Sequence, residues 1–230
     1  MKKSFITLLF MSLSTLLLGQ VNEVGLFLGG SNYVGDVGRT NYVYPNKIAY
    51  GLIYKWNWNP RIAVRGTLTR MPISANDDDA DNSGRTSREF DFTNKISEIA
   101  LGIEFNFYEY DLSSDDKTWT PYILAEVAAF NYSVATDASG ATSYQDRITS
   151  YTDKTSYAIP FGVGIKSKIS DKFAVAIETR FRYTFVDDID YTTTNFSELD
   201  YGGNGNDWYV FTGFSLVYTF GRPACYTNGL

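Results

Sequence analysis

The chain of 230 residues contains no histidine and a single cysteine, Cys225. Without an imidazole it cannot form a histidine-based catalytic triad, a histidine-ligated metal site or an imidazole general base. One cysteine cannot form a disulfide within the chain, so Cys225 is either free or bonded to another molecule. These absences exclude the common designs of lipases and proteases, and we expect no enzyme activity, no cofactor and no metal site.

Basic residues are also in the minority, with 20 lysines and arginines against 26 aspartates and glutamates. The resulting net charge of -6 argues against a nucleic-acid partner, because binding to phosphates requires clustered positive charge. After residue 20 the chain has no apolar run long enough to cross a membrane as a helix.

Residues 1–20 have the pattern of a cleaved secretory signal peptide. Lys2 and Lys3 precede a mostly apolar run from residue 5 to residue 18, and small Gly19 follows it. No cysteine stands at the position that a bacterial lipoprotein would use, so a lipid anchor is not expected. The sequence therefore predicts export, with one mature domain over residues 21–221 and a short periplasmic tail over residues 222–230.

Polar and apolar residues alternate through most of the mature chain, which indicates β-strands with one apolar face. In residues 172–186, for example, the face opposite the aromatic side chains carries Glu178, Arg180 and Arg182. The weakest case is residues 121–132, where Glu126 shares a face with Leu124. The pattern predicts eight strands, at residues 23–29, 48–58, 61–70, 95–108, 121–132, 157–169, 172–186 and 208–220.

Most of these strands are about ten residues long or more, as tilted transmembrane strands are, whereas strands of soluble sandwiches have about five or six. Aromatic residues such as Trp56, Phe107 and Phe220 stand near strand ends, which is typical of aromatic girdles at the two membrane interfaces. The predicted fold is all-β: an eight-stranded antiparallel up-and-down barrel that spans the outer membrane of a Gram-negative bacterium. Long connections alternate with short ones, so we expect the long loops outside the cell and both termini in the periplasm.

The predicted inner face of this barrel carries charges of both signs. An eight-stranded barrel is just wide enough for side chains to fill its lumen. These charges would form either a structural network of ion pairs in a closed barrel, which we favour, or the lining of a gated pore. The charged residues expected there are Lys55, Arg65, Glu104, Glu178, Arg180 and Arg182.

An acidic segment in one long connection, containing Asp77, Asp78, Asp79 and Asp81, resembles the start of a calcium-binding loop. The glycine and the closing glutamate of such a loop would fall on Asn82 and Arg88, so the motif fails. We expect a solvated acidic loop here, in preference to a weak cation site.

Several segments resemble the PorG-like barrel family of Bacteroidetes, a component of the type IX secretion system. The first is GLFLGGSNYVGD at residues 25–36, which includes Gly29, Gly30, Asn32, Tyr33, Gly35 and Asp36. The others are residues 51–68 with the turn Trp-Asn-Pro-Arg, EIALGIEFNF at residues 98–107, TPYILAEVAAF at residues 120–130 and IPFGVGIK at residues 159–166.

The resemblance implies an outer-membrane barrel that contacts a periplasmic ring made of a lipoprotein and its partner, PorK and PorN in that system. The barrel would anchor the secretion machinery without being the conduit, and Cys225 would be a covalent tether to the ring lipoprotein. The alternative is a small closed or narrow-pore barrel that binds a ligand through outer loops near residues 77–81 or 187–190 and has no link to secretion.

Overall fold

The computed structural model describes residues 21–112, 118–137, 148, 150–193, 195, 200 and 205–221. The predicted signal peptide, residues 1–20, and the tail that contains Cys225 lie outside the described residues. No helix in the described part of the chain is long and apolar enough to cross a membrane.

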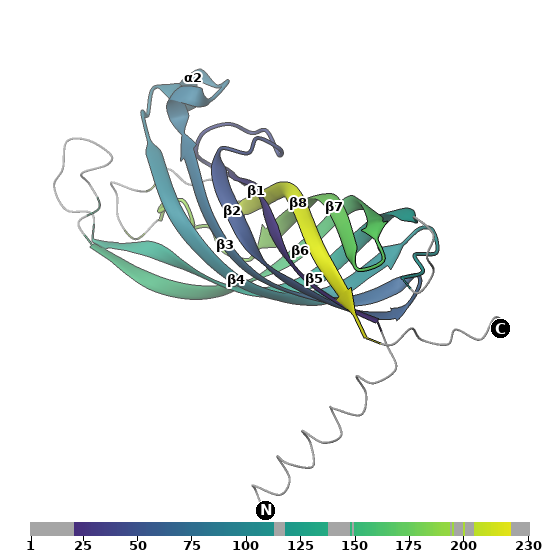
Figure 1. Cartoon of the computed structure of the whole chain (residues 1–230). Coiled ribbons are helices and arrows are strands. Elements are labelled where there is room, and N and C mark those ends of the chain that lie inside the picture. Colours follow the sequence, from purple (N-terminus) through teal and green to yellow (C-terminus); the bar gives the residue numbers. More distant parts are fainter. Residues whose placement is uncertain are drawn as a thin grey trace, which may run out of the picture.

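The chain forms one closed barrel in which each strand pairs with its neighbours in sequence and β8 closes on β1 (Figure 1). All of the pairings are antiparallel, so the predicted up-and-down topology is confirmed. The short helices η1 (Asp77–Asp79) and α2 (Ser83–Thr86) lie in the connection between β3 and β4. The strands are β1 (Val21–Val34), β2 (Lys47–Asn59), β3 (Ile62–Asn76), β4 (Asp91–Asn106), β5 (Trp119–Asp137), β6 (Ser150–Ser170), β7 (Phe173–Thr184) and β8 (Trp208–Phe220).

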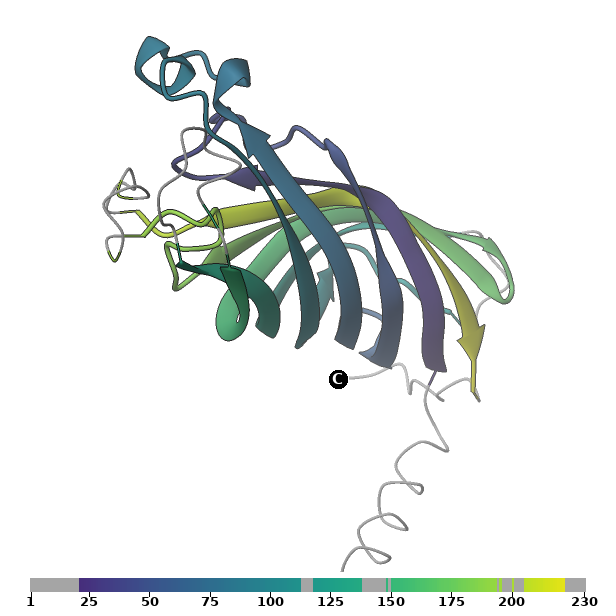
Figure 2. The same cartoon turned by 90° about the vertical axis from the view of Figure 1, so that its left-hand side faces the viewer.

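Several strands extend further toward the long loops than the sequence pattern predicts. β3 continues to Asn76, and β6 begins at Ser150 where residue 157 was expected. The apolar alternation stops where the wall leaves the lipid, but backbone pairing continues among polar residues beyond that edge, as between Ser133 and Asp153. The long loops are therefore shorter than predicted, and parts of the wall project past the rest of the barrel (Figure 2).

The outer wall is apolar and exposed, as lipid-facing strands are. Leu26, Ile99 and Phe214, for example, have 62%, 59% and 67% of their surface exposed. One prediction about this wall is wrong: the aromatic residues at 56, 107 and 220 do not mark both interfaces. All of them lie at strand ends next to the short turns or the chain ends. The girdle at the long-loop end is formed instead by Tyr42, Phe161, Phe181, Tyr183 and Trp208.

The inner face divides into two regions along the barrel. Toward the long loops it is an apolar core that includes Phe92, Ile96, Phe130 and Phe211. Toward the short turns it carries most of the buried charge of the chain. The doubtful strand β5 follows the same alternation, with Glu126 inside and Val127 outside.

Candidate functional site

Charged side chains fill the lumen between the two ends of the barrel. Among the described residues, six basic and five acidic side chains are buried on inward-facing strand positions. They are Lys55, Arg65, Lys166, Lys168, Arg180 and Arg182, with Glu23, Glu98, Glu104, Glu126 and Glu178.

Glu104 accepts contacts from three cations on three other strands. Lys55 Nζ lies 3.0 Å from Glu104 Oε2, Arg65 Nη1 lies 3.2 Å from the same oxygen, and Lys166 Nζ lies 2.5 Å from Oε1. Glu23 lies on the far side of Lys55, at 3.8 Å. Since all of these groups are buried, each charge is stabilised by its partners and not by solvent.

Arg65 also binds Glu178 on the opposite wall, with its Nη1 and Nη2 atoms 2.8 and 2.7 Å from the two carboxylate oxygens. Such paired, charge-assisted hydrogen bonds are among the strongest in proteins. The Tyr122 hydroxyl donates to Glu178 at 2.6 Å. Arg180 lies 3.1 Å from the same carboxylate and is packed between the rings of Phe27 and Phe211.

A further group lies closer to the long loops. Arg182 donates from Nη2 and Nε to the two oxygens of Glu98, at 3.1 and 3.2 Å. The Tyr209 hydroxyl donates to the same carboxylate at 2.7 Å. The charges thus continue along the lumen until the apolar core begins.

Glycines on neighbouring strands make room for these long side chains. Arg65 pairs across the ladder with Gly102, Arg180 with Gly162, and Glu178 with Gly164. A Cβ atom at Gly102 would lie within 2.8 Å of the Glu126 side chain, so even alanine would crowd the lumen. Alternation of small and large residues therefore allows a narrow barrel to hold this many charges.

All six charged residues predicted for the interior lie there. Sequence reasoning missed five other buried charges, and the signal was present for several of them. Glu98 shares its inward face with Glu104, six residues further along β4, and Lys166 shares the face of Gly164. Glu126 was predicted to share a face with Leu124. Because that face mixes apolar and charged residues, the sequence did not indicate that it points into the lumen.

Each carboxylate of the described lumen has a basic side chain within 4.0 Å. Glu104 and Glu178 both bind Arg65. A general acid or base must reach a substrate, whereas these carboxylates are buried inside a filled lumen. The geometry favours the structural network over a gated pore.

The residues of the segment at 29–36 gather where β1 leaves the barrel. The Asn32 side chain donates to the carbonyl of Tyr42 at 3.1 Å and accepts from the backbone of Tyr44 at 3.2 Å, which holds the first long loop. Gly30 lies against Pro45 of that loop, and Gly29 faces Gly213 of β8, where a Cβ atom would not fit. The segment therefore joins the first long loop to the end of β1.

Tyr33 joins this segment to the last long loop. Its hydroxyl contacts the carboxylates of Asp190, at 2.7 Å, and Asp207, and it accepts from the backbone of Asp36 at 3.1 Å. Gly35 packs directly on the Tyr33 hydroxyl. A hydroxyl carries one proton, so two carboxylates can bind it together only if one of them is protonated.

The electrostatics of this pair agree with a shared proton. Burial raises the pKa of Asp190 to about 6. Burial and the charge of Asp190 raise the pKa of Asp207 well above its ordinary value. At the partly exposed Asp187 next to them, burial and the charge of Asp36 raise the pKa to about 6.

The last long loop, between β7 and β8, has buried residues at 189–191 that fill the barrel mouth. Ile189 is fully buried and its backbone N–H donates to Asp207 at 2.9 Å. Asn94, on the inner face of β4, donates to the carbonyls of Ile189 and Ser133, both at 2.8 Å. The Tyr191 ring packs on Phe92. The loop therefore acts as a plug made from the chain itself.

The acidic segment at residues 77–81 is only partly the solvated loop that we expected. Asp77 is buried and bound by Arg88, with Nε 2.9 Å and Nη2 3.0 Å from its two oxygens, and it accepts from Gly38 N–H at 2.8 Å. Asp79 lies on the surface near Arg39. No group of acidic side chains in the described part of the chain has the geometry of a metal site.

Comparisons with known proteins give one family and several distant structures. A family model described as "Domain of unknown function (DUF6089)" matches residues 2–229. No curated protein matches the sequence.

Three of the similar solved structures are a β-barrel domain, a surface protein and an attachment invasion locus protein. The N-terminal β-barrel domain of Pseudomonas aeruginosa OprF has a TM-score of 0.46 and 11% identity, and the match covers 88% of this chain and 98% of that one. Neisserial surface protein A has a TM-score of 0.45 and 9% identity, with coverages of 87% and 95%. Yersinia pestis Ail has a TM-score of 0.42 and 12% identity, and the match covers 88% of this chain and 100% of that one. At these values the likenesses say nothing about ligands or partners.

Neutralising Glu104, the lumen carboxylate that contacts three cations, is expected to destabilise the barrel. Glu104→Gln keeps the shape of the side chain but leaves Lys55, Lys166 and Arg65 without its charge. Loss of one partner from a buried ion network costs about 3–5 kcal/mol. The urea midpoint of the barrel folded into lipid vesicles should fall accordingly. Glu109→Gln, which removes the carboxylate of an exposed pair with Arg61, is the matched control and should leave the midpoint unchanged.

The plug is expected to loosen as pH rises. Because the pKa of Asp190 is raised to about 6, the folded loop binds more protons than the open loop between about pH 4 and 6, and stability falls through this window. Between pH 5 and pH 8 the free energy of opening should drop by about 1.4 kcal/mol, because pH 5 lies about one unit below the raised pKa. Hydrogen exchange at the amides of Ile189 and Thr192, corrected for intrinsic rates, measures this at pH 5 and pH 8.

Asp190→Asn should weaken that pH dependence, because an amide keeps hydrogen bonds to Tyr33 and Thr192 without titrating. Asp153→Asn, at an exposed site on β6, should leave the dependence as it is in the wild type. Equal protection of the two amides at both pH values in the wild type would show that the acid pair does not control the plug.

Proposed function

We propose that this chain, which belongs to the family described as "Domain of unknown function (DUF6089)", is an outer-membrane barrel that anchors a periplasmic assembly of the type IX secretion machinery. The observation that carries the proposal is the filled lumen. Glu104 and Glu178 bind cations from several walls, and Ile189 plugs the mouth. A barrel closed in this way offers its partners a surface and not a conduit.

The surface at the short-turn end is suited to this role because its backbone is already fixed. Asn59 Oδ1 accepts from the N–H groups of Arg61 and Ile62, both at 2.8 Å, and holds the first turn. The carbonyl of Pro60 in that turn accepts from Tyr110 N–H at 3.0 Å, and Arg61 Nη1 donates to the carbonyl of Phe107 at 2.8 Å. Two separate connections are thereby joined. A rigid surface loses little entropy on binding.

The resemblance to the PorG-like family supplies the identity of the partner in this proposal. The partner is a periplasmic ring lipoprotein of the PorK and PorN type, and both termini face the periplasm. β8 ends at Phe220, which pairs with Asn22 near the start of β1 at the short-turn end, and Cys225 follows five residues later in the sequence. In the proposal the tail at residues 222–230 contacts the ring, and Cys225 is its point of covalent attachment.

Exposed arginines at the two ends of the barrel provide a matched test. Arg61 pairs with Glu109 at 3.4 Å at the short-turn end, and Arg39 pairs with Asp79 at 3.5 Å at the long-loop end. Arg61→Glu should reduce several-fold the ring lipoprotein that co-purifies from outer membranes, whereas Arg39→Glu should not. Non-reducing gels should show a larger species in the wild type that is absent from Cys225→Ala.

Equal recovery of the lipoprotein with both arginine variants would place the contact elsewhere and contradict the short-turn surface. A disulfide-linked species that persists in Cys225→Ala would contradict the tether. A barrel that purifies alone would contradict the anchoring role itself.

The alternative of a small pore is not favoured by any contact in the described lumen. Opening a path would require separation of Arg65 from both Glu104 and Glu178, and each group would then be a buried, unpaired charge. The purified wild-type barrel should therefore give no single-channel openings in planar bilayers. Steady openings that persist in the folded protein would support the pore and overturn the closed lumen.

A further inference from the structure

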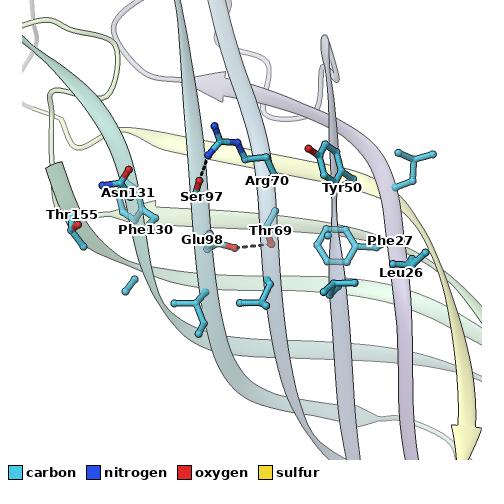
Figure 3. Close-up of a pocket in the computed structure, with 16 residues that line it drawn as sticks. Leu26, Phe27, Tyr50, Thr69, Arg70, Ser97, Glu98, Phe130, Asn131 and Thr155 are labelled. Carbon is cyan, nitrogen blue, oxygen red and sulfur yellow. Dashed lines mark hydrogen bonds between the residues drawn. The ribbon is translucent and has the colours of Figure 1, made fainter. Parts of the chain in front are cut away.

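The outer wall of the barrel contains an open hollow of about 890 Å³ that extends across β1 to β6 (Figure 3). It lies on the face that would contact lipid, because outward-pointing leucines from β1, β2 and β3 line it. The proposed partner surface does not involve this hollow, whereas Glu98 of the lumen network forms part of its lining.

Strand register arranges the outward residues of the hollow in two rows. In the row nearer the long loops, Tyr50 pairs with Arg70, Arg70 with Ser97, and Ser97 with Asn131. Thr155 continues this row on β6, opposite Asn131. The upper row is therefore polar and carries one positive charge.

The second row lies one alternation closer to the short turns and is apolar. Leu26 pairs with Leu52, Leu52 with Leu68, and Leu68 with Ile99. Below Leu68 on the same face, Gly66 has no side chain, and a Cβ atom there would meet nothing closer than 3.9 Å. An apolar track thus continues down the wall from the hollow.

The aromatic girdle is interrupted above this hollow. On the wall formed by β6, β7 and β8, the ring of Phe161 contacts those of Phe181 and Trp208. On β3, β4 and β5, the outward residues at the long-loop side of the hollow are Arg70, Ser97 and Asn131, none of which is aromatic. A lipid-facing girdle normally contains Trp and Tyr around the barrel, so this sector has a different surface chemistry.

Arg70 is exposed and its guanidinium donates to the Ser97 hydroxyl. No carboxylate in the described part of the chain lies within 4.0 Å of Arg70, unlike the arginines of the lumen. Lys95 adds a second exposed cation, since it faces Pro72 one pair further along β4. A guanidinium that has no carboxylate partner and lies beside an apolar surface is suited to bind an amphiphile with an anionic head and acyl chains.

We propose that this hollow is a binding site for one phosphorylated lipid of the leaflet on the long-loop side. An acyl chain lies over Leu52, Leu68 and the track at Gly66, and a phosphate of the headgroup binds Arg70 and Ser97. In the orientation of the proposed function this leaflet is the outer one, where the lipid is a phosphorylated glycolipid.

Lipid A, with and without its phosphates, tests the site directly. The purified barrel in detergent is titrated with diphosphorylated lipid A, and bound lipid is counted by native mass spectrometry. The wild type should bind one molecule saturably. Arg70→Gln should weaken binding about fivefold, because one basic residue at an anionic lipid surface contributes about that factor. Lys172→Gln, which changes an exposed lysine in the short turn between β6 and β7, should bind as the wild type does.

Dephosphorylated lipid A should bind the wild type about as weakly as diphosphorylated lipid A binds Arg70→Gln. Binding of dephosphorylated lipid A to Arg70→Gln should be no weaker still, because the phosphate and the guanidinium contribute to affinity through the same contact. Leu68→Trp, which fills the hollow from an outward position, should weaken both lipids. Heat-dependent gel mobility confirms that each variant is folded.

Equal affinity of wild type and Arg70→Gln would overturn the site, as would the absence of saturable binding. A second copy or another protein on this wall, seen as an oligomer that excludes lipid A, would also overturn it. These results are independent of the recovery of the ring lipoprotein, so the lipid site and the anchoring role fail separately.

Discussion

Neutralisation of charge inside the barrel is the constraint on which the rest of the structure depends. The lumen has neither lipid nor bulk water to stabilise an ion, so each charge needs a partner from another strand. Arg65 on β3 binds Glu104 on β4 and Glu178 on β7. A shift of one residue in any of these strands would turn its charges toward the lipid. The network therefore fixes the register of strands that are distant in sequence.

The same constraint determines what the barrel can do. Because the charges and the glycines opposite them fill the lumen, transport through the barrel would require breaking the pairs that hold its register. Function is then left to the surfaces: the two ends and the lipid-facing wall. The mouth adds to this closure, since Asn94 holds the last long loop in place from inside the barrel.

The sequence predicts the features that follow from alternation and not those that depend on contacts between distant segments. β8 has the predicted bounds, and the six predicted lumen charges face inward, because a period of two defines both strand and face. The ends of β6 were missed because backbone pairing continues past the apolar pattern. Asp77 binds Arg88, which lies 11 positions away, and Tyr33 binds Asp190, which lies 157 positions away. No local sequence pattern predicts either contact.

The two ends of the barrel are stabilised by different physical interactions, so they respond differently to a change of pH. At the short-turn end, backbone carbonyls and the Asn59 amide hold the turns, and these groups do not titrate. At the long-loop end, a buried acid pair holds the plug, and its strength depends on a proton. The ion network between them keeps the wall rigid. A change of pH at the long-loop end can therefore rearrange the mouth while the surface proposed to hold the secretion machinery keeps its shape.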